Sequence, residues 1–425
     1  MEIMRSTWSS WKTSRLGSQV TLRNGSAFSA DNWKSSGLPI VRIQNLKDTR
    51  APFNFYDGAL DSKVVLQNGD LLFSWSGSKG TSFGPHIWCG AKAVLNQHIF
   101  RVDLRTDANV TKQFLYFALL HQTAGIESHA YGLAALVHVR KGDLENTTIP
   151  VPSLNEQRQI AHVLSAFQQA IERQKRLITL AAELKKALMH KLFTNGTRGE
   201  PLKQTDIGAV PQSWTVTELQ EVAEPPQYGF TASAQPAGNA QILRITDIQN
   251  AGVNWSSVPY CECTLEDLAQ HRLRTGDLVF ARIGATTGKN FLVVDPPDSA
   301  VFASYLIRVR PRETLVPGFA AYFCQTAAYW RQIAASKGNN LKGGFNSSLL
   351  RRLLIALPAD PTEQHLIVEV LAALDRKIDV ARRTSAVLNA GFRTLLHQLM
   401  TAEIRVHDLD LCAFEETEQE PVGVS

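Results

Sequence analysis

The sequence has no apolar run long enough to cross a bilayer, and it contains little cysteine. Its first residues, MEIMRSTWSSWK, lack the apolar core of a signal peptide, so we expect a cytoplasmic protein with no membrane contact. The five cysteines are scattered, and only Cys261 and Cys263 lie close together, without a second ligand pair at zinc spacing. We therefore expect buried or inert thiols and no metal site.

The chain also has no large excess of positive or negative charge. The 44 Lys and Arg residues nearly balance 39 Asp and Glu residues, and the net charge of +5 does not identify a partner. The last segment, EETEQEPVGVS, is acidic and polar, so the remainder is more basic than the total suggests. At 425 residues and 44% hydrophobic residues, the chain is long and apolar enough for two or three packed domains.

No complete catalytic motif is present. Residues 295–298, DPPD, resemble the DPPY motif of adenine methyltransferases, but an Asp replaces the aromatic ring that must stack on the flipped base. Residues 284–289, GATTGK, are one residue short of a phosphate loop, and Asn290 replaces the magnesium-binding Ser or Thr. Residues 61–63, DSK, have nuclease-like spacing without a second acidic residue upstream to hold magnesium. We predict that this chain has no catalytic residues.

A long helix is predicted over residues 153–195, because its apolar residues recur in steps of four and three, as in a coiled coil. The same pattern returns 207 positions later, in residues 359–402. The expected interface residues are Ile160, Leu164, Phe167, Ile171, Ile178, Leu188 and Leu192 in the first helix, and Ile367, Leu371, Leu374, Ile378, Leu388, Leu395 and Leu399 in the second. Two polar residues in the first pattern, Gln174 and Lys185, lower stability but can fix the register of the helices.

Both helices are predicted to start in the same way. Ser153 with Glu156, and Asp360 with Glu363, have the spacing of a capping box, in which side chains satisfy the free amides of the first turn. Such a cap contributes about 1 kcal/mol. The next residue is a glutamine in both helices. The repeated start indicates that the two helices are copies of one unit.

The segments before the two helices, which we call the heads, also match each other. LPIVRIQNL at residues 38–46 matches QILRITDI at residues 241–248, and NGDLLFSWSG at 68–77 matches TGDLVFARIG at 275–284. In each case the Gly-Asp pair reads as a turn that opens a buried strand, which is a structural role. Short apolar runs between Gly, Pro and Asn turns, with helical patches at 113–121 and 318–332, predict an α+β fold for each head.

The predicted order is a first head at 11–152, a first helix at 153–195, a connector at 196–213, a second head at 214–358, a second helix at 359–402 and a tail at 403–425. Two such units can close around a pseudo-twofold axis if the helices run antiparallel as a coiled coil. Residues 402–411 would then return to the first head. A helix of about 40 residues is roughly 60 Å long and would act as a spacer between two heads.

At this point the chain resembles a known family. IPVP directly before NEQRQI, a long helix ending in HKLFTNG, the connector IGAVPQSW and a second helix starting with EQ are similar to the specificity subunit of type I restriction-modification systems. The second helix departs from this pattern, since His365-Leu366 replaces Arg158-Gln159 and Gly391 interrupts the flank of the coiled coil.

The resemblance implies a non-catalytic protein that binds double-stranded DNA. Each head would be a target recognition domain that reads one half of a split sequence. The two helices would set the distance between the halves and bind two methyltransferase subunits, and restriction subunits would join through them. S-adenosylmethionine, ATP and magnesium would bind to these partners, and no cofactor would bind to this chain.

Contacts with DNA require Lys and Arg for phosphates, and polar side chains on loops for base edges. The candidates in the first head are Ser78, Lys79, Thr81, Arg140 and Lys141, and those in the second head are Arg282, Lys289, Lys337, Asn339, Asn340 and Lys342. Any one of the basic residues is more often a solvated surface charge than a contact. The Gly-rich loops at 77–82 and 336–344 are favoured, since small residues let the backbone approach a ligand closely.

An alternative from a different class remains open. The chain can be a coiled-coil interaction scaffold whose heads bind protein or RNA. Salt separates the two hypotheses, because binding to duplex DNA through several phosphates weakens by orders of magnitude as the salt concentration rises.

Overall fold

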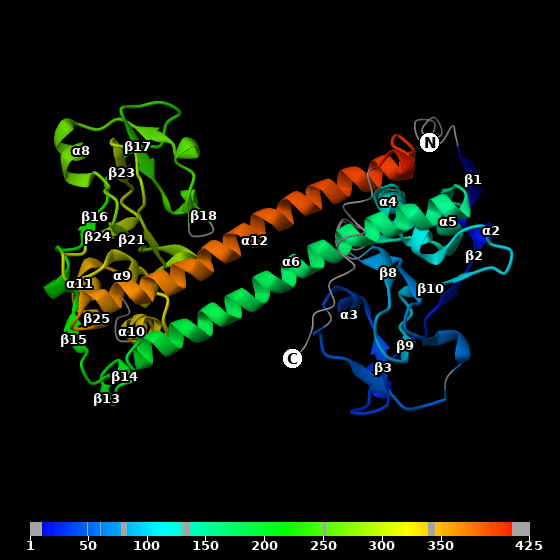
Figure 1. The fold of residues 1–425 in the computed structure, drawn as a ribbon, viewed down its shortest axis with the longest axis horizontal. Helices are drawn as coiled ribbons and strands as arrows, with labels where there is room; N and C mark the ends of the chain where they lie inside the picture. The colour runs from blue at the N-terminus through cyan, green and yellow to red at the C-terminus, as the bar shows by residue number, and fades with distance from the viewer. Residues whose placement is uncertain are drawn as a thin grey trace. The chain divides into compact units, whose positions relative to one another are not determined.

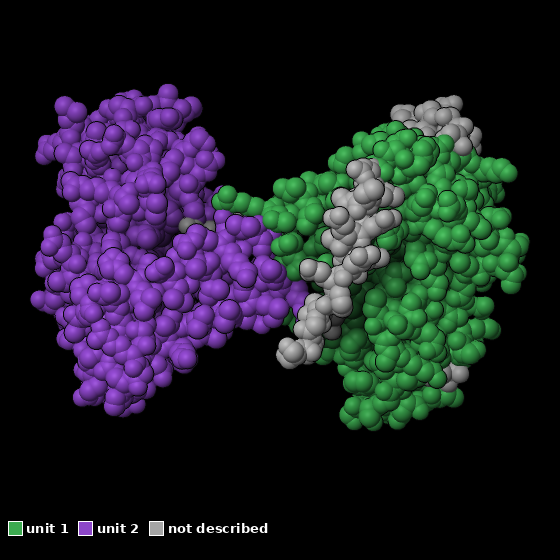
Figure 2. Space-filling model, viewed as in Figure 1, with its two compact units in different colours: residues 1–175, 383–425 green, residues 176–382 purple. Residues whose placement is uncertain are grey.

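The computed structural model describes residues 11–48, 50–59, 61–77, 83–128, 130, 137–249, 252–338 and 345–409. The chain divides into two compact units, one of residues 1–175 with 383–425, and one of residues 176–382 (Figure 2). Unit 1 contains the first head and unit 2 the second, and each unit contains one half of each long helix. Among the described residues, no helix is both long and apolar enough to cross a membrane.

The two long helices are α6, Leu154–Asn195, and α12, Pro361–Thr401 (Figure 1). Ser153 Oγ accepts a hydrogen bond from Glu156 N at 3.3 Å, and Asp360 Oδ1 accepts one from Thr362 N at 2.9 Å. The predicted return of the Glu side chains to the cap is wrong, because both carboxylates bind residues beyond the end of the other helix, as described below. Each helix ends at a left-handed residue, Gly196 with φ +63° and Ala402 with φ +59°.

In unit 1 the start of α6 packs against the end of α12. Ile160 and Leu164 lie in one apolar cluster with Leu396 and Leu399, and further along the pair Phe167 lies over Gly391. In unit 2, Phe193 near the end of α6 lies in one cluster with Ile367 near the start of α12. The two helices therefore run antiparallel within each unit.

Half of the expected interface residues are fully buried and the others are partly buried. Buried are Ile160, Leu164, Ile171, Ile367, Leu371, Ile378 and Leu399. Partly buried are Phe167, Ile178, Leu188, Leu192, Leu374, Leu388 and Leu395. The apolar stripe thus faces the protein interior along both helices.

The first head is built on two four-stranded sheets. One has the order β2-β10-β6-β8, with bounds Val20–Asn24, Ile99–Leu104, Leu71–Ser74 and Gly84–Ile87. The other has the order β4-β3-β9-β5, with bounds Asn54–Tyr56, Leu38–Val41, Ala93–Leu95 and Val65–Leu66. Two further pairs are β1 (Lys12–Arg15) with β12 (Thr148–Val151), and β7 (Ser76–Gly77) with β11 (Val137–His138). Its helices are α2 (Leu16–Gln19), α3 (Ile43–Lys47), α4 (Lys112–Ser128) and α5 (Lys141–Glu145).

The second head repeats this plan. Its main sheet has the order β16-β24-β21-β22, with bounds Gln227–Tyr228, Leu306–Val309, Leu278–Ala281 and Asn290–Leu292. A second sheet has the order β20-β17-β23, with bounds Tyr260–Cys261, Ala240–Leu243 and Ala300–Phe302. Pairs form between β15 (Thr215–Glu218) and β25 (Leu354–Leu357), β18 (Ile248–Gln249) and β19 (Gly252–Val253), and, in the connector, β13 (Leu202–Thr205) and β14 (Gly208–Pro211).

The helices of the second head are α7 (Leu219–Val222), α8 (Leu265–His271), α9 (Pro317–Phe323), α10 (Ala327–Gly338) and α11 (Ser347–Arg351). Single 3-10 turns lie at Ala30–Asn32, Ser62–Val64, Ile245–Asp247, Trp255–Ser257, Gly284–Thr286 and Val406–Asp408. Each head combines antiparallel pairs with one parallel pair, β3 with β9 and β17 with β23. The predicted α+β class with two long helices is confirmed. The helical patch of the second head differs from the prediction, since it is split into α9 and α10.

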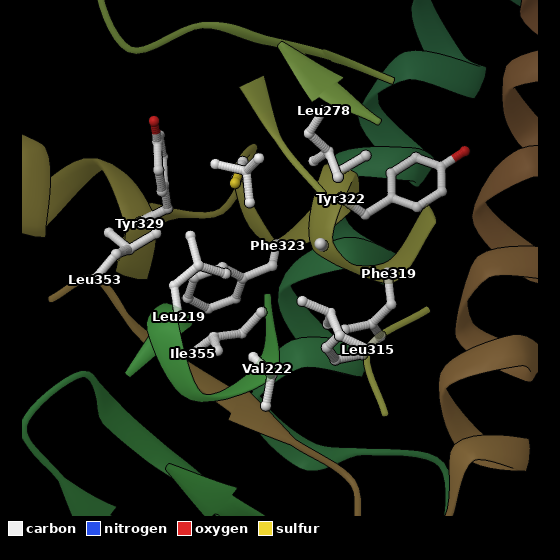
Figure 3. Packing of buried hydrophobic residues seen from close by; sticks show 14 of the residues in the cluster. Leu219, Val222, Leu278, Leu315, Phe319, Tyr322, Phe323, Tyr329, Leu353 and Ile355 are labelled. Atoms are coloured by element: carbon white, nitrogen blue, oxygen red, sulfur yellow. The ribbon is translucent and has the colours of Figure 1, made fainter. Parts of the chain in front are cut away.

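The core of the second head is aromatic. Figure 3 shows Phe323 lying against Leu219 and Ile355, with the hydroxyl groups of Tyr322 and Tyr329 pointing out of the cluster. The Tyr329 hydroxyl donates to Gly288 O at 2.6 Å, so the polar end of this buried ring is satisfied. The same apolar cluster extends onto both long helices, which fixes the second head to the helical part of unit 2.

The two Gly-Asp pairs have the predicted structural role. Gly69 and Gly276 adopt positive φ angles of +85° and +96°, which glycine allows without steric cost. The following carboxylates, on Asp70 and Asp277, each accept a hydrogen bond at 2.8 Å from a backbone amide three residues earlier. Both turns open a strand, β6 or β21, whose residues are buried throughout.

Candidate nucleic-acid interface

Each head is attached to the start of a long helix by a buried glutamine. Gln157 Oε1 accepts from Thr111 N at 2.7 Å, and its Nε2 donates to Asn109 O at 2.8 Å. In the second head Gln364 Oε1 accepts from Val316 N at 2.9 Å, and its Nε2 donates to Thr314 O at 3.0 Å. In both heads the buried amide is hydrogen-bonded at its oxygen and at its nitrogen. A movement of the head that broke one of these bonds would leave a buried polar group unpaired, at a cost of about 1–3 kcal/mol. Each head is therefore hydrogen-bonded directly to the start of its long helix.

A second contact is repeated in both units: an arginine that follows one long helix pairs with a glutamate at the start of the other, and we call it the closing arginine. In unit 1, Arg405 Nη1 lies 2.6 Å from Glu156 Oε1, and its guanidinium lies 5.2 Å from the centre of the Trp11 ring. In unit 2, Arg198, which occupies the matching place after the first helix, lies 3.5 Å from Glu363 Oε2. Glu363 also accepts from Thr197 N and Oγ1 at 2.8 and 2.9 Å. The described part of the tail, up to residue 409, thus returns to the first head as predicted.

We use the name first rim for four residues that the fold of the first head brings together: Asn24 at the end of β2, Trp75 after β6, His98 before β10 and His138 at the end of β11. Trp75 is half-buried, stacks on Phe100 at 5.6 Å, and meets the rings of His98 and His138 at 5.4 and 6.0 Å. Its Nε1 donates to Asn24 Oδ1 at 3.2 Å. Burial, and then the charge of His138, lowers the pKa of His98. Within the part of the chain that the structure describes, the Nδ1 atoms of both histidines are buried without a hydrogen-bond partner.

The second rim consists of Tyr228, Arg282 and Tyr305 in the second head. The Arg282 guanidinium lies 4.8 Å from the centre of the Tyr228 ring, and its Nη1 donates to Ser304 O at 3.4 Å. The Tyr228 hydroxyl accepts from Ser347 N at 3.2 Å, at the start of α11. Burial opposes ionisation of Tyr228, but the bond to Ser347 and the Arg282 charge outweigh it and lower its pKa. Tyr228 and Tyr305 are exposed, so this rim offers two rings and one cation to a ligand.

The two rims occupy equivalent places in the repeated fold. Trp75 N donates to His98 O at 3.3 Å, and Arg282 N donates to Tyr305 O at 3.1 Å. The strand pairings also correspond, since Asn24 lies opposite Phe100 in one sheet and Tyr228 lies opposite Ile307 in the other. Three positions therefore match: 24 with 228, 75 with 282, and 98 with 305.

Some of the contact residues predicted from the sequence lie near these rims. Arg140 and Lys141 are exposed at the start of α5, two and three residues after His138, and Lys141 Nζ lies 3.6 Å from Glu145 Oε1. Lys289 is exposed, and its carbonyl accepts from Ala281 N, beside Arg282. Ser78, Lys79, Thr81, Asn339, Asn340 and Lys342 lie outside the described residues, and Lys337 lies in α10 with its side chain undescribed.

Of the residues in the two rims, Arg282 was predicted from the sequence. Sequence reasoning missed the other six, which are Asn24, Trp75, His98, His138, Tyr228 and Tyr305. The signal for Trp75 was present, since it aligns with Arg282 in the repeated NGDLLFSWSG and TGDLVFARIG segments. The other rim residues come from strands far apart in sequence, and only the folded sheet brings them together.

Two of the motifs discounted from the sequence lie in a turn and in an ion pair. Residues 284–286 form a single 3-10 turn, and Asp298 forms an ion pair with Arg272. Among the described residues, no group of three His, Cys, Asp or Glu side chains is placed to hold a metal ion. Burial raises the pKa of Cys261 to about 11, so this thiol stays protonated. Of the other described cysteines, Cys324 is buried, Cys263 is partly buried and Cys89 is exposed.

Comparison with known proteins gives consistent matches. A profile described as type I restriction modification DNA specificity domain matches residues 9–181. The chain is 24% identical over 410 residues to the specificity subunit of the type I restriction enzyme MjaVIII from Methanocaldococcus jannaschii, covering 94% of both chains. It is 22% identical over 438 residues to the EcoBI specificity subunit from Escherichia coli, covering 96% of this chain and 90% of the relative.

The fold is similar to the crystal structure of the S subunit of a type I restriction-modification system from M. genitalium. The TM-score is 0.61 at 16% identity, and the similarity covers 92% of this chain and 96% of the other. At this identity the likeness concerns the fold alone.

Proposed function

Because this chain belongs to the family of type I restriction-modification specificity subunits, we propose that its two heads read the two halves of a split sequence in double-stranded DNA. One observation carries this proposal. The heads share a strand order, a glutamine attachment and a closing arginine, yet their rims carry different side chains at three equivalent positions. A common frame with different contact surfaces is what two recognition domains for two different half-sites require.

The long helices are proposed to set the distance between the half-sites. With 42 and 41 residues, α6 and α12 are each roughly 60 Å long at 1.5 Å per residue. This length is on the scale of one to two turns of duplex DNA, at roughly 34 Å per turn. The antiparallel pairing within each unit supports a stiff spacer, since the apolar stripe is buried along both helices.

The same helices are proposed to bind two methyltransferase subunits, with restriction subunits joining the complex through them. Four large apolar side chains on the helices are at least half exposed: Leu180, Leu184, Val380 and Val387. Exposed apolar side chains of this size favour a surface that a partner covers. On this proposal the chain itself is non-catalytic, and S-adenosylmethionine, ATP and magnesium bind to the partners.

Exchange of a head tests the proposal. Residues 16–150 or residues 219–356 would be replaced by the corresponding head of another specificity subunit, in the complex with the methyltransferase subunits. Sequencing of methylated host DNA should show one new half-site and one unchanged half-site for each exchange. A change in both half-sites, or in neither, would contradict the modular reading.

Binding measurements separate this function from the alternative scaffold that binds protein or RNA. The affinity of the complex for duplex DNA carrying its methylated sequence should fall by orders of magnitude between low and high salt. Affinity for RNA that exceeds affinity for this duplex, with little dependence on salt, would favour the alternative.

A further inference from the structure

We propose that Arg282 reads a base in the half-site of the second head, with its guanidinium presented to the paired acceptors on the major-groove edge of guanine. The inference rests on the proposed function and names one residue and one ligand group within it. The evidence for it is the geometry of the second rim and the comparison of the second rim with the first rim.

Arg282 differs from other arginines of the same head in its partners. Arg244, Arg272 and Arg310 each form an ion pair with an aspartate, namely Asp247, Asp298 and Asp277. Within the described part of the chain, Arg282 forms no ion pair; its guanidinium lies over the ring of Tyr228 and donates one long hydrogen bond to Ser304 O. Most of its donors therefore remain available to a ligand.

The second rim also holds Arg282 in place. The guanidinium stacks on Tyr228, and Tyr228 is itself fixed by the bond from Ser347 N to its hydroxyl. A stacked side chain loses less conformational entropy on binding, which favours affinity. The planar fork of an arginine matches the O6 and N7 acceptors of guanine, and this is the most common specific contact between proteins and DNA bases.

The comparison of the two heads favours a contact of Arg282 with a base over a contact with a phosphate. The position of Arg282 is occupied by Trp75 in the first head, on the same backbone frame. Both heads must hold a phosphate backbone of the same chemistry, so a phosphate contact at this position would call for a cation in both. A base contact differs between heads when the half-sites differ, and the change from tryptophan to arginine is of this kind.

All three matched rim positions differ between the heads. Asn24, Trp75 and His98 correspond to Tyr228, Arg282 and Tyr305, so every one of the three positions changes its chemistry. Beneath the rim the two heads match, with Phe73 and Phe280 in equivalent strands and an arginine next to each on the paired strand, Arg101 or Arg308. A preserved frame under a changed surface indicates that the rim is where the two heads acquire different specificities.

The test uses the complex of the full chain with its methyltransferase subunits. The half-sites would be mapped by methylation of host DNA, and then each base pair would be substituted in turn in a synthetic duplex. Arg282→Gln and Arg282→Lys would be compared with Arg272→Gln, which removes an exposed arginine of the same head. Melting temperatures would show that each variant is folded.

Both Arg282 variants should lose roughly ten- to a hundredfold discrimination at one base pair of one half-site, since a good bidentate contact supplies that much. Arg282→Lys keeps the charge but not the fork, so its dependence on salt should stay unchanged. The Arg272→Gln control should keep the full specificity at both half-sites. Uniform weakening over all sequences, with the salt slope reduced by about 1, would identify a phosphate contact and overturn the proposal.

Unaltered specificity in folded Arg282 variants would also overturn it. The head exchange distinguishes this failure from failure of the proposed function. If replacement of residues 219–356 changes one half-site while Arg282→Gln does not, the second head reads DNA through other residues. If the head exchange also has no effect, the proposed function itself is wrong.

Discussion

Single side chains account for the acid sensitivity that we expect of unit 1. Burial, and then the charge of Lys47, lowers the pKa of His86 to about 4. Burial, and then His397, lowers the pKa of His121 to about 4, against a smaller opposing effect of Glu403. The folded protein therefore keeps both imidazoles neutral at pH values where the unfolded chain, with a pKa of about 6.5, binds protons.

This linkage gives a prediction for stability. Between about pH 6.5 and pH 4 the unfolded state of unit 1 binds more protons than the folded state, so the free energy of unfolding falls as the pH falls. Each histidine contributes up to about 3 kcal/mol to this loss. His86→Gln should flatten the dependence of the unfolding temperature on pH in this window. His162→Gln, which changes an exposed histidine on α6, should retain the wild-type slope, and a slope equal in both variants would refute the assignment.

Among the elements, the helix pair of unit 2 contains a polar contact in its apolar seam. Lys185 Nζ lies 2.7 Å from Asp375 Oδ1, and the Tyr322 hydroxyl donates to Asp375 Oδ2 at 2.7 Å. Burial, and then this bond to Asp375, raises the pKa of Tyr322, so the phenol stays protonated as a donor. The equivalent places in unit 1 are taken by Phe392 and Gln168, and the contact there is neutral.

Lys185→Met should destabilise unit 2, because it leaves the Asp375 carboxylate without its cation. The side chain of Lys185 is 17% exposed and that of Asp375 is 44% exposed, so solvent screens the pair and we expect a loss of about 1–2 kcal/mol. The double variant Lys185→Phe with Asp375→Gln copies the neutral pair of unit 1 and should recover most of the loss. Chemical denaturation measures both, and a double variant less stable than Lys185→Met would contradict this explanation.

The elements also show how far sequence reasoning reaches. The spacing of apolar residues predicted both long helices, and the Gly-Asp pairs predicted the turns before β6 and β21, because these signals are local. The partners of Glu156 and Glu363 were not predictable, since Arg405 and Thr197 lie far away in sequence and reach the carboxylates only after folding. Of the rim residues, Arg282 was predicted as a candidate contact, and the others escaped prediction for the same reason. The split between α9 and α10 had no clear signal in the sequence.

On the scale of the whole molecule, the repeated attachments support the prediction that one head can be exchanged without the other. Each head meets the start of its helix through one buried glutamine, whose side chain bonds backbone atoms of the head. Each head also packs apolar side chains, such as Phe117 and Phe319, against both long helices. A replacement head that folds in the same way and keeps apolar side chains at these positions would form the same contacts.

The central claim is that the helices set the distance between two half-sites. It is tested most directly by removing residues 173–179 and 380–386, one heptad at matching places in both helices, and mapping the methylated sequence. A heptad keeps the seam facing the partner helix and shortens each helix by about 10 Å. We predict both half-sites unchanged and a gap shorter by one to about three base pairs, given roughly 3.4 Å per base pair. A methylated sequence with both half-sites and an unchanged gap would contradict the account.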